Sequence, residues 1–306
     1  MNTRQRNKRM PKTLAFIGLG AMGLPMAERL VGAQLRVVGF DLRPEAMVTL
    51  EAKGGHGARS IAEAARGADT LITMVVNADQ AEDVLFAKGA VEALAPGASV
   101  IVMATCAPAR VQAMAARVKA TGRAFIDAPV SGGVAGASTG TLTIMAAAPE
   151  ADFARVKPVL EVLGNKLFHL GEAAGQGAAM KVVNQLLCGV HIAVAAEGLA
   201  FAESAGIDPA KALEILSGSA AQSWMLNARG KRMVADDGQV TSAVDIFVKD
   251  LSLVLDAGRA MKAGLPLAAA AHQLFLAASG MGHGSRDDSQ VIETYRALAP
   301  KGAKRS

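Results

Sequence analysis

The sequence has little cysteine and few aromatic residues. Only Cys106 and Cys188 occur in 306 residues, and they do not form a Cys-x-x-Cys pair. This pattern argues against a disulfide framework and against a cysteine-ligated metal site, so a reducing cytoplasm is the expected location. Aromatic residues make up 4% of the chain, which leaves little of the stacking surface that RNA-binding proteins use.

The sequence also lacks a long uninterrupted apolar run. A membrane helix needs about 18 such residues, whereas the richest stretch, Val190–Ala202, is interrupted by His191 and Glu197. The first segment, Met1–Lys12, is basic but has no apolar core of a secretory signal, so we expect a flexible basic arm. Neither feature predicts a membrane partner.

Charged residues account for only 19% of the chain and apolar residues for 51%, the balance of a compact globular protein. The net charge is +5, but most of the basic excess lies at the two ends. Seven basic residues are found there: Arg4, Arg6, Lys8, Arg9, Lys301, Lys304 and Arg305. The body of the protein is therefore close to neutral, which argues against a nucleic-acid partner. The length suggests about two domains.

A glycine-rich turn follows the first predicted strand, Thr13–Gly18. The turn reads Gly18-Leu19-Gly20-Ala21-Met22-Gly23. A helical pattern then runs through Leu30, and a second predicted strand, Leu35–Phe40, ends at Asp41. Strand, glycine turn, helix, strand and acidic residue are the context in which this motif binds a dinucleotide.

Each part of the motif has a physical reason. Gly18 permits the tight turn, Gly20 lets the backbone approach a pyrophosphate, and Gly23 lets the helix pack closely on the strand. The start of the helix offers N–H groups to the phosphates. Asp41, about 20 residues further on, favours the ribose hydroxyls of NAD over the 2′-phosphate of NADP, although Arg43 is a signal in the other direction.

Short strands continue to alternate with helices such as Pro108–Ala120 and Glu150–Leu163. The further predicted strands are Asp69–Val75, Ser99–Ala104, Ala124–Asp127, Thr141–Ala146 and Lys166–Leu170. This rhythm predicts an α/β fold: a Rossmann-type, doubly wound, mostly parallel sheet over residues 13–173.

Ligands of such sheets bind beyond the carboxyl ends of the strands. That edge includes Val76, Asn77 and Thr105, which we predict to contact the cofactor; an ordinary helix cap is an equal alternative for Thr105. The edge also carries Asp127-Ala128-Pro129.

A second glycine-rich segment, Ser131-Gly132-Gly133, comes after the fifth predicted strand. Its exposed N–H groups suit the carboxylate of a substrate. A flexible glycine loop is the alternative.

The stretch Gly175–Gln185 begins with a glycine turn and enters an alanine-rich helix. Lys181 and Asn184 lie three residues apart, so they share one face of that helix. Taken alone, such a lysine more often lies over apolar surface with its charge in water. From Ala178 to Ala299 the patterns are helical, with a cap at Asp208-Pro209 and no convincing strand, which predicts an all-helical second domain over residues 174–306. The histidines stand singly and predict no metal site.

Four segments in order resemble the signatures of the β-hydroxyacid dehydrogenase family. They are Gly18–Met26, Asp127–Gly140, Gly175–Gln185 and Lys249-Asp250-Leu251. The resemblance implies that Lys181 is the catalytic proton acceptor and that Ser131, Gly132, Gly133 and Asn184 bind the substrate. It also implies that Lys249 contacts the cofactor or closes the cleft, and that the helical domain forms a homodimer or homotetramer. A solvated Lys249–Asp250 pair is the alternative.

Within this family, several stretches look closer to L-threonate dehydrogenases than to 3-hydroxyisobutyrate dehydrogenases. They include Val75–Ala78, Gln185–Ala193, Ser223–Met225, Ser242–Leu251 and Asp287–Ser289. Trp224 could close the substrate pocket, with core packing as an equal alternative. Asn184 is the residue of the wider family, whereas the threonate enzymes tend to have histidine there. Reductases of tartronate or succinic semialdehyde, and a silent dinucleotide-binding scaffold, remain as rival interpretations.

Overall fold

The structure, a computed structural model, describes residues 12–235 and 238–298. The basic arm predicted for Met1–Lys12 lies, except for Lys12, outside the described residues. The chain divides between Lys181 and Val182 into two compact units, which are described separately below.

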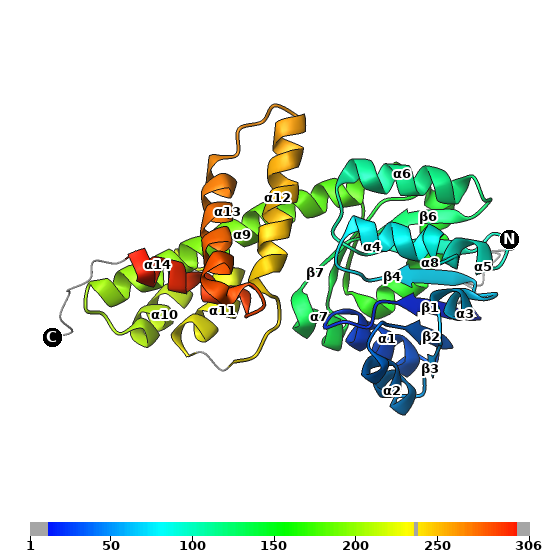
Figure 1. The fold of residues 1–306 in the computed structure, drawn as a ribbon, viewed down its shortest axis with the longest axis horizontal. Helices are drawn as coiled ribbons and strands as arrows, with labels where there is room; N and C mark the ends of the chain where they lie inside the picture. The colour runs from blue at the N-terminus through cyan, green and yellow to red at the C-terminus, as the bar shows by residue number, and fades with distance from the viewer. Residues whose placement is uncertain (1–11, 236–237, 299–306) are drawn as a thin grey trace, which may run out of the picture. The chain divides into compact units, whose positions relative to one another are not determined.

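The first unit is built on a sheet of six parallel strands in the order β3-β2-β1-β4-β5-β6 (Figure 1). The strands are β1 (Leu14–Ile17), β2 (Val37–Phe40), β3 (His56–Gly57), β4 (Thr70–Thr73), β5 (Ser99–Val102) and β6 (Ala124–Asp127). The order reverses direction on the two sides of β1, as expected for a doubly wound sheet. The predicted fold class is thus confirmed for this unit.

Helices lie along the sheet, and both of its faces are buried. The elements are α1 (Gly23–Gly32), α2 (Pro44–Ala52), α3 (Ile61–Ala65), α4 (Ala78–Glu82), the π-helical turn η1 (Asp83–Ala87), α5 (Ala90–Ala93), α6 (Pro108–Lys119), α7 (Gly133–Thr139) and α8 (Glu150–Leu163). Strand β1 is buried along its whole length because its side chains alternate between two separate apolar clusters.

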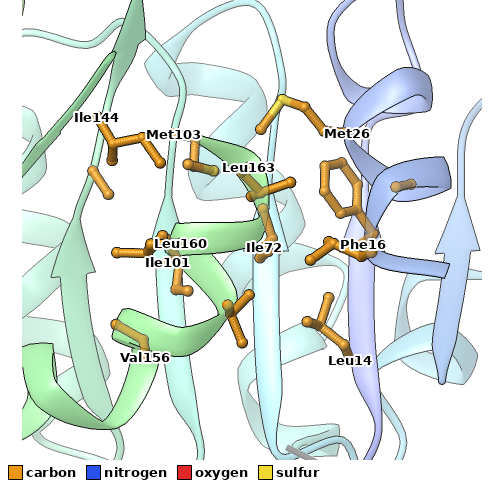
Figure 2. Packing of buried hydrophobic residues seen from close by; sticks show 14 of the residues in the cluster. Leu14, Phe16, Met26, Ile72, Ile101, Met103, Ile144, Val156, Leu160 and Leu163 are labelled. Atoms are coloured by element: carbon orange, nitrogen blue, oxygen red, sulfur yellow. The ribbon is translucent and has the colours of Figure 1, made fainter. Parts of the chain in front are cut away.

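One cluster contains Leu14 and Phe16 of β1 together with Met26 of α1 and Leu160 of α8 (Figure 2). The other contains Ala15 and Ile17 with residues of α3, α5 and α6. Burial on both faces explains why these strands read as continuous apolar runs instead of alternating polar and apolar residues.

A second, smaller sheet corrects the sequence-based prediction. The predicted strands Thr141–Ala146 and Lys166–Leu170 do not extend the large sheet; they form β8 (Thr143–Ala146) and β9 (Lys166–His169) of a separate three-stranded sheet. Its third strand, β7 (Val130–Ser131), is antiparallel to β8 and was not predicted. Strands β3 and β7 have two residues each, too few to show a periodic pattern.

The described residues of the second unit form helices, as predicted, apart from an isolated bridge between Ala243 and Asp287. The elements are α9 (Gln176–Ser204), which begins in the first unit, α10 (Pro209–Ser217), α11 (Trp224–Val234), α12 (Val244–Ala260), α13 (Pro266–Ala278), the short helical turns η2 (Ser279–His283) and η3 (Asp288–Val291), and α14 (Ile292–Leu298). Their core includes the stacked rings of Phe247 and Phe275, whose centroids are 5.2 Å apart.

Helix α9 has 29 residues and is apolar enough, by length and composition, to cross a membrane. Of its most apolar window, 56% is buried inside the protein. The core helix of a soluble protein passes the same test, so this single helix is weak evidence for a membrane span.

Candidate active site

Two glycines of the glycine-rich turn are required by the fold itself. Gly18 has φ +93°, and a Cβ added there would lie 2.4 Å from the Met74 carbonyl oxygen. A Cβ added at Gly23, the first residue of α1, would lie 1.8 Å from the Gly18 carbonyl oxygen. Any side chain at either position would therefore collide with backbone, which fixes the tight turn and the close start of α1.

The middle glycine, Gly20, is different. A Cβ added at this position would meet only the Arg43 Nη2 atom, at 4.0 Å. The protein's own packing gives no reason for a glycine here, whereas a backbone approached closely by a phosphate does. Helix α1 has no side-chain cap at its start, Met22, so no side chain competes with an anion for its first N–H groups. The turn therefore fits a dinucleotide pyrophosphate.

The other residues of the turn differ in exposure. Leu19 is buried in the core, so only its backbone faces the turn, while Ala21 is exposed and Met22 is half-buried. A ligand at this turn would thus be bound by backbone groups more than by side chains.

Asp41 follows β2 and links the second strand to the turn. Its Oδ2 accepts a hydrogen bond from the Leu19 N–H at 2.7 Å, and its Oδ1 accepts from Arg43 N at 2.9 Å and from Arg43 Nε at 3.2 Å. Arg43 Nη2 also donates to the Leu19 carbonyl at 3.1 Å. Since the guanidinium of Arg43 is already paired with Asp41, it is a weaker signal for a 2′-phosphate than its sequence position suggested.

Replacing Gly20 with alanine is expected to weaken NAD binding by at least about tenfold while leaving the melting temperature unchanged, because the new methyl group enters the space for the pyrophosphate. Titration of NADH fluorescence and a thermal melt measure the two quantities. Gly32→Ala is the matched control, since Gly32 ends the same helix and an added Cβ there meets nothing within 4 Å. Equal NAD affinity in both variants would show that the turn does not hold the cofactor.

Three further residues were predicted to contact the cofactor from the sheet edge. Asn77 caps α4, accepting a hydrogen bond from the Gln80 N–H at 2.9 Å, and the Val76 N–H donates to Gln80 Oε1 at 2.9 Å. Thr105 is half-buried, and α6 begins after Ala107, so the alternative that Thr105 caps this helix is wrong. Cofactor contact stays a prediction for these positions.

The segment Ser131-Gly132-Gly133 is part of regular structure. Ser131 ends β7, Gly132 precedes α7 with φ +130°, and Gly133 opens α7 with φ +62°. The segment is therefore not an irregular loop over its whole length. Positive φ at both glycines disfavours residues with a side chain, and a Cβ added at Gly133 would meet nothing within 4 Å. This leaves open space beside the backbone at the start of α7, as a carboxylate site would need.

Asp127 is a residue whose role the sequence did not reveal. It ends β6, is 1% exposed, and its Oδ2 accepts hydrogen bonds from the N–H groups of Gly175 at 2.9 Å and of Ala178 at 3.0 Å. Burial raises the pKa of Asp127 to about 6, against the opposing effect of these N–H donors. A buried acid at a strand end is a signal, but its partners lie about 50 residues further along the chain.

Lys181 lies in the second turn of α9 and is 7% exposed. Such burial argues against the alternative of a lysine whose charge reaches bulk water. Asn184, one helical turn later, is half-buried, and its Oδ1 lies 3.8 Å from the Cys188 sulfur. The amine and the amide thus share one face of a single helix, as predicted from their spacing.

In the helical unit, Asp250 of α12 is 2% exposed. It accepts a hydrogen bond from Gln185 Nε2 of α9 at 2.5 Å and forms an ion pair with Lys249. The alternative of a solvated Lys249–Asp250 pair is therefore wrong. Instead Asp250 joins α12 to α9 through Gln185, the residue after Asn184, and it also fixes Lys249. No local sequence pattern predicts this connection.

Trp224 is the first residue of α11 and is 57% exposed. Core packing, the alternative considered for it, is wrong. Ser223 explains the start of α11, since its hydroxyl accepts the Leu226 N–H at 3.0 Å. A large exposed indole at a helix start is available for contact with a ligand or another chain.

Two ion pairs tie α11 to the segment around η3. Arg229 binds Asp288 through two hydrogen bonds of 2.7 and 3.0 Å, and Arg232 Nε binds Asp287 at 3.0 Å. Asp288 is fully buried, and burial raises its pKa to about 6 although Arg229 favours its ionised form. Asp287 and Asp288 belong to the stretch that looks closer to L-threonate dehydrogenases. Their ion pairs thus stabilise the helix that carries Trp224.

Within residues 12–235 and 238–298, no group of three or more His, Cys, Asp or Glu side chains could hold a metal ion. His272 instead pairs with Ser252 at 3.0 Å, and His283 lies 3.3 Å from Arg286.

Comparison with known proteins gives the family. Residues 13–171 match the family model described as the NAD binding domain of 6-phosphogluconate dehydrogenase, and residues 175–295 match the model described as NAD-binding of NADP-dependent 3-hydroxyisobutyrate dehydrogenase. The L-threonate dehydrogenase of Cupriavidus necator is 44% identical over 287 residues, which cover 94% of this chain and 97% of that protein.

Two further similar proteins are both described as 3-hydroxyisobutyrate dehydrogenase. The 3-hydroxyisobutyrate dehydrogenase of Pseudomonas aeruginosa is 36% identical, over 92% of this chain and 98% of that protein. A crystal structure described as 3-hydroxyisobutyrate dehydrogenase from Salmonella typhimurium superimposes with a TM-score of 0.88 at 41% identity, over 92% of this chain and 99% of that chain. Because models, relatives and structure agree over nearly the whole length, this chain belongs to the β-hydroxyacid dehydrogenase family of NAD(P)-dependent oxidoreductases.

Proposed function

We propose that the protein oxidises L-threonate to its 2-oxo acid with NAD, and that Lys181 accepts the proton of the substrate hydroxyl. The burial of Lys181 on a helix that starts against the carboxyl end of β6 carries this proposal, since that edge is where such sheets bind ligands. An amine buried there, with an amide on the same face, has the arrangement of a proton acceptor with a partner for substrate hydroxyls.

The reaction removes a hydride from the carbon that carries the hydroxyl and a proton from the hydroxyl oxygen. NAD, held by Gly18–Gly23 with Asp41 at the ribose, supplies the acceptor for the hydride. Ser131, Gly132 and Gly133 bind the substrate carboxylate through the strand end and the start of α7. Lys181 takes the proton, and in the reverse direction its ammonium returns it to the carbonyl oxygen. Val76, Asn77, Thr105 and Lys249 complete the cofactor contacts in this proposal.

The choice of L-threonate rests on similarity. Relatives named L-threonate dehydrogenase reach 44% identity, whereas the relative named 3-hydroxyisobutyrate dehydrogenase in Pseudomonas aeruginosa reaches 36%. The structure described as 3-hydroxyisobutyrate dehydrogenase from Salmonella typhimurium, at 41%, keeps that acid as the second candidate. Asn184 and the exposed Trp224 are the residues we propose to contact the part of the substrate in which these acids differ.

Among L-threonate, D-erythronate, D-glycerate and 3-hydroxyisobutyrate, we expect L-threonate to give the highest kcat/KM, and NAD to exceed NADP at least about tenfold because Asp41 would repel a 2′-phosphate. The rate of NADH or NADPH formation measures both preferences. A higher kcat/KM for 3-hydroxyisobutyrate would instead identify the protein as a 3-hydroxyisobutyrate dehydrogenase. No turnover with any of the acids, or with tartronate and succinic semialdehydes in the reverse direction, would leave a silent dinucleotide-binding scaffold.

We also propose that the helical unit forms a homodimer or homotetramer in the cytoplasm. Exposed apolar side chains recur along one side of α9, at Leu187, Val194 and Phe201, in steps of seven residues. Such a stripe is typical of a helix that packs against another chain.

A further inference from the structure

Asp127 and the start of α9 form a tightly fitted junction within the first unit. One carboxylate oxygen accepts N–H groups from Gly175 and Ala178, and the Gly177 N–H also stabilises the ionised carboxyl. The first N–H groups of a helix have no partner inside the helix, so an acceptor there both satisfies them and fixes the direction of the helix.

The junction is closely packed on the side that faces the sheet. A Cβ added at Gly177 would lie 2.4 Å from the Met145 carbonyl oxygen and 3.0 Å from the Asp127 Cγ. The backbone of α9 at Gly177 is therefore in direct contact with β8 and with the end of β6. Only glycine permits this approach.

The position of Lys181 follows from this contact. It comes four residues after Gly177 and three after Ala178, spacings that place side chains on the same face of a helix. Ala178 is 1% exposed and packs into the cluster on one face of the large sheet. The face of α9 that Asp127 fixes against the sheet is thus the face that carries the lysine.

We propose that Asp127 is a positioning residue for catalysis: its ionised carboxylate fixes the first turn of α9 against β6 and thereby sets the position of the Lys181 amine. This inference rests on the proposed role of Lys181. Protonation of Asp127 removes a charged acceptor from two N–H groups and loosens the first turn of α9. Activity should therefore require ionised Asp127.

The charged surroundings of Asp127 are simple. It pairs with Val102 of β5 and, across a bridge, with Ala147, neither of which titrates. Beyond Ala147, the titratable groups His169 and Glu150 pair with each other at 3.1 Å. On α9, Lys181 is the ionisable group nearest to the junction along the chain, and Cys188, His191, Glu197 and Glu203 follow further along the helix. Burial raises the pKa of Asp127 to about 6, against the lowering effect of the N–H donors of Ala178, Gly175 and Gly177.

The test is the pH dependence of kcat between pH 5 and pH 8 for the full protein and for Asp127→Asn. In the wild type the ionisation of Asp127, with a pKa of about 6, adds one to the acid-side slope of log kcat against pH. In Asp127→Asn the slope should fall by one, and kcat at pH 8 should fall about 10- to 100-fold, as expected for a misplaced catalytic group. The dissociation constant of NADH should stay within about twofold, because Asp127 lies on β6, which β4 and β5 separate from the strand that precedes the glycine turn.

Asp69→Asn is the matched control. Asp69 lies in the same unit, and its Oδ2 also accepts two backbone N–H groups, those of Lys12 at 2.9 Å and Thr13 at 3.1 Å, far along the chain from α9. Its kcat and its slope should equal those of the wild type. Equal losses in both variants would mean that any lost backbone acceptor impairs the enzyme, and the positioning role would be wrong.

Two outcomes separate this inference from the proposed function. If Lys181→Ala abolishes turnover but Asp127→Asn keeps the wild-type kcat and slope, only the role of Asp127 is overturned. If Lys181→Ala retains turnover, the proposed function itself fails. Should Asp127→Asn not fold, the wild type alone still decides, because a kcat that stays constant from pH 8 to pH 5 would exclude a required ionisation of Asp127.

Discussion

Lys181→Ala is expected to lower kcat by about 1,000-fold, within the range of 10²–10⁴ that a positioned proton acceptor contributes. The physical reason is that hydride loss from the substrate carbon leaves a protonated carbonyl unless the hydroxyl proton has an acceptor. The affinity for NAD should remain that of the wild type, since the predicted cofactor turn is built from Gly18–Gly23. Initial rates of NADH formation and NADH fluorescence titration give the two quantities.

Two variants control this result. Lys181→Met keeps most of the apolar stem and removes the amine, so it should be as inactive as Lys181→Ala if the proton acceptor is what matters. Lys119→Ala removes an exposed lysine from the end of α6 in the same unit and should leave kcat unchanged. A folded Lys181→Ala protein with wild-type turnover would contradict the assignment.

Asp288→Ala is expected to lower the free energy of unfolding of the helical unit by about 3–5 kcal/mol, because it leaves the Arg229 guanidinium buried without its counter-charge. Arg229 is only 9% exposed and Asp288 is fully buried, so water replaces little of the lost contact. Urea unfolding followed by the fluorescence of Trp224 reports on this region directly, since Trp224 and Arg229 lie on the same helix.

The matched comparison is an exposed pair of the same kind. Arg259 and Asp256 on α12 form an ion pair of 2.9 Å, with 78% and 64% of their side chains exposed. Asp256→Ala should change the free energy of unfolding by at most about 1 kcal/mol. Similar losses for the two variants would show that burial does not determine the contribution of the Arg229–Asp288 pair.

Local sequence patterns predicted the large parallel sheet, the glycine turn and the helical second unit. Each depends on features that recur within a few residues, such as the strand before Gly18 and the acidic residue after β2. The same patterns missed β3 and β7, which have two residues each, and assigned β8 and β9 to the wrong sheet. The local sequence pattern does not determine which distant segments pair as strands.

The site shows the same limit. The spacing of Lys181 and Asn184 predicted their shared helix face, but not what fixes that helix. The acceptor of its first N–H groups, Asp127, lies 48 and 51 residues before them, and the partner of Asp250 lies 65 residues away on α9. The exposure of Trp224 was likewise beyond prediction, because a tryptophan in an apolar sequence favours burial.

The junction at Asp127 also bears on the order in which the chain folds. The N–H groups at the start of α9 find this acceptor only when β6 lies in place, and β6 pairs in turn with β5. A helix of 29 residues forms quickly from local contacts, whereas a parallel sheet forms slowly from distant ones. The first turn of α9 is therefore expected to fray during folding until the sheet is complete. The proposed catalytic lysine would then be one of the last residues of its unit to reach its final position.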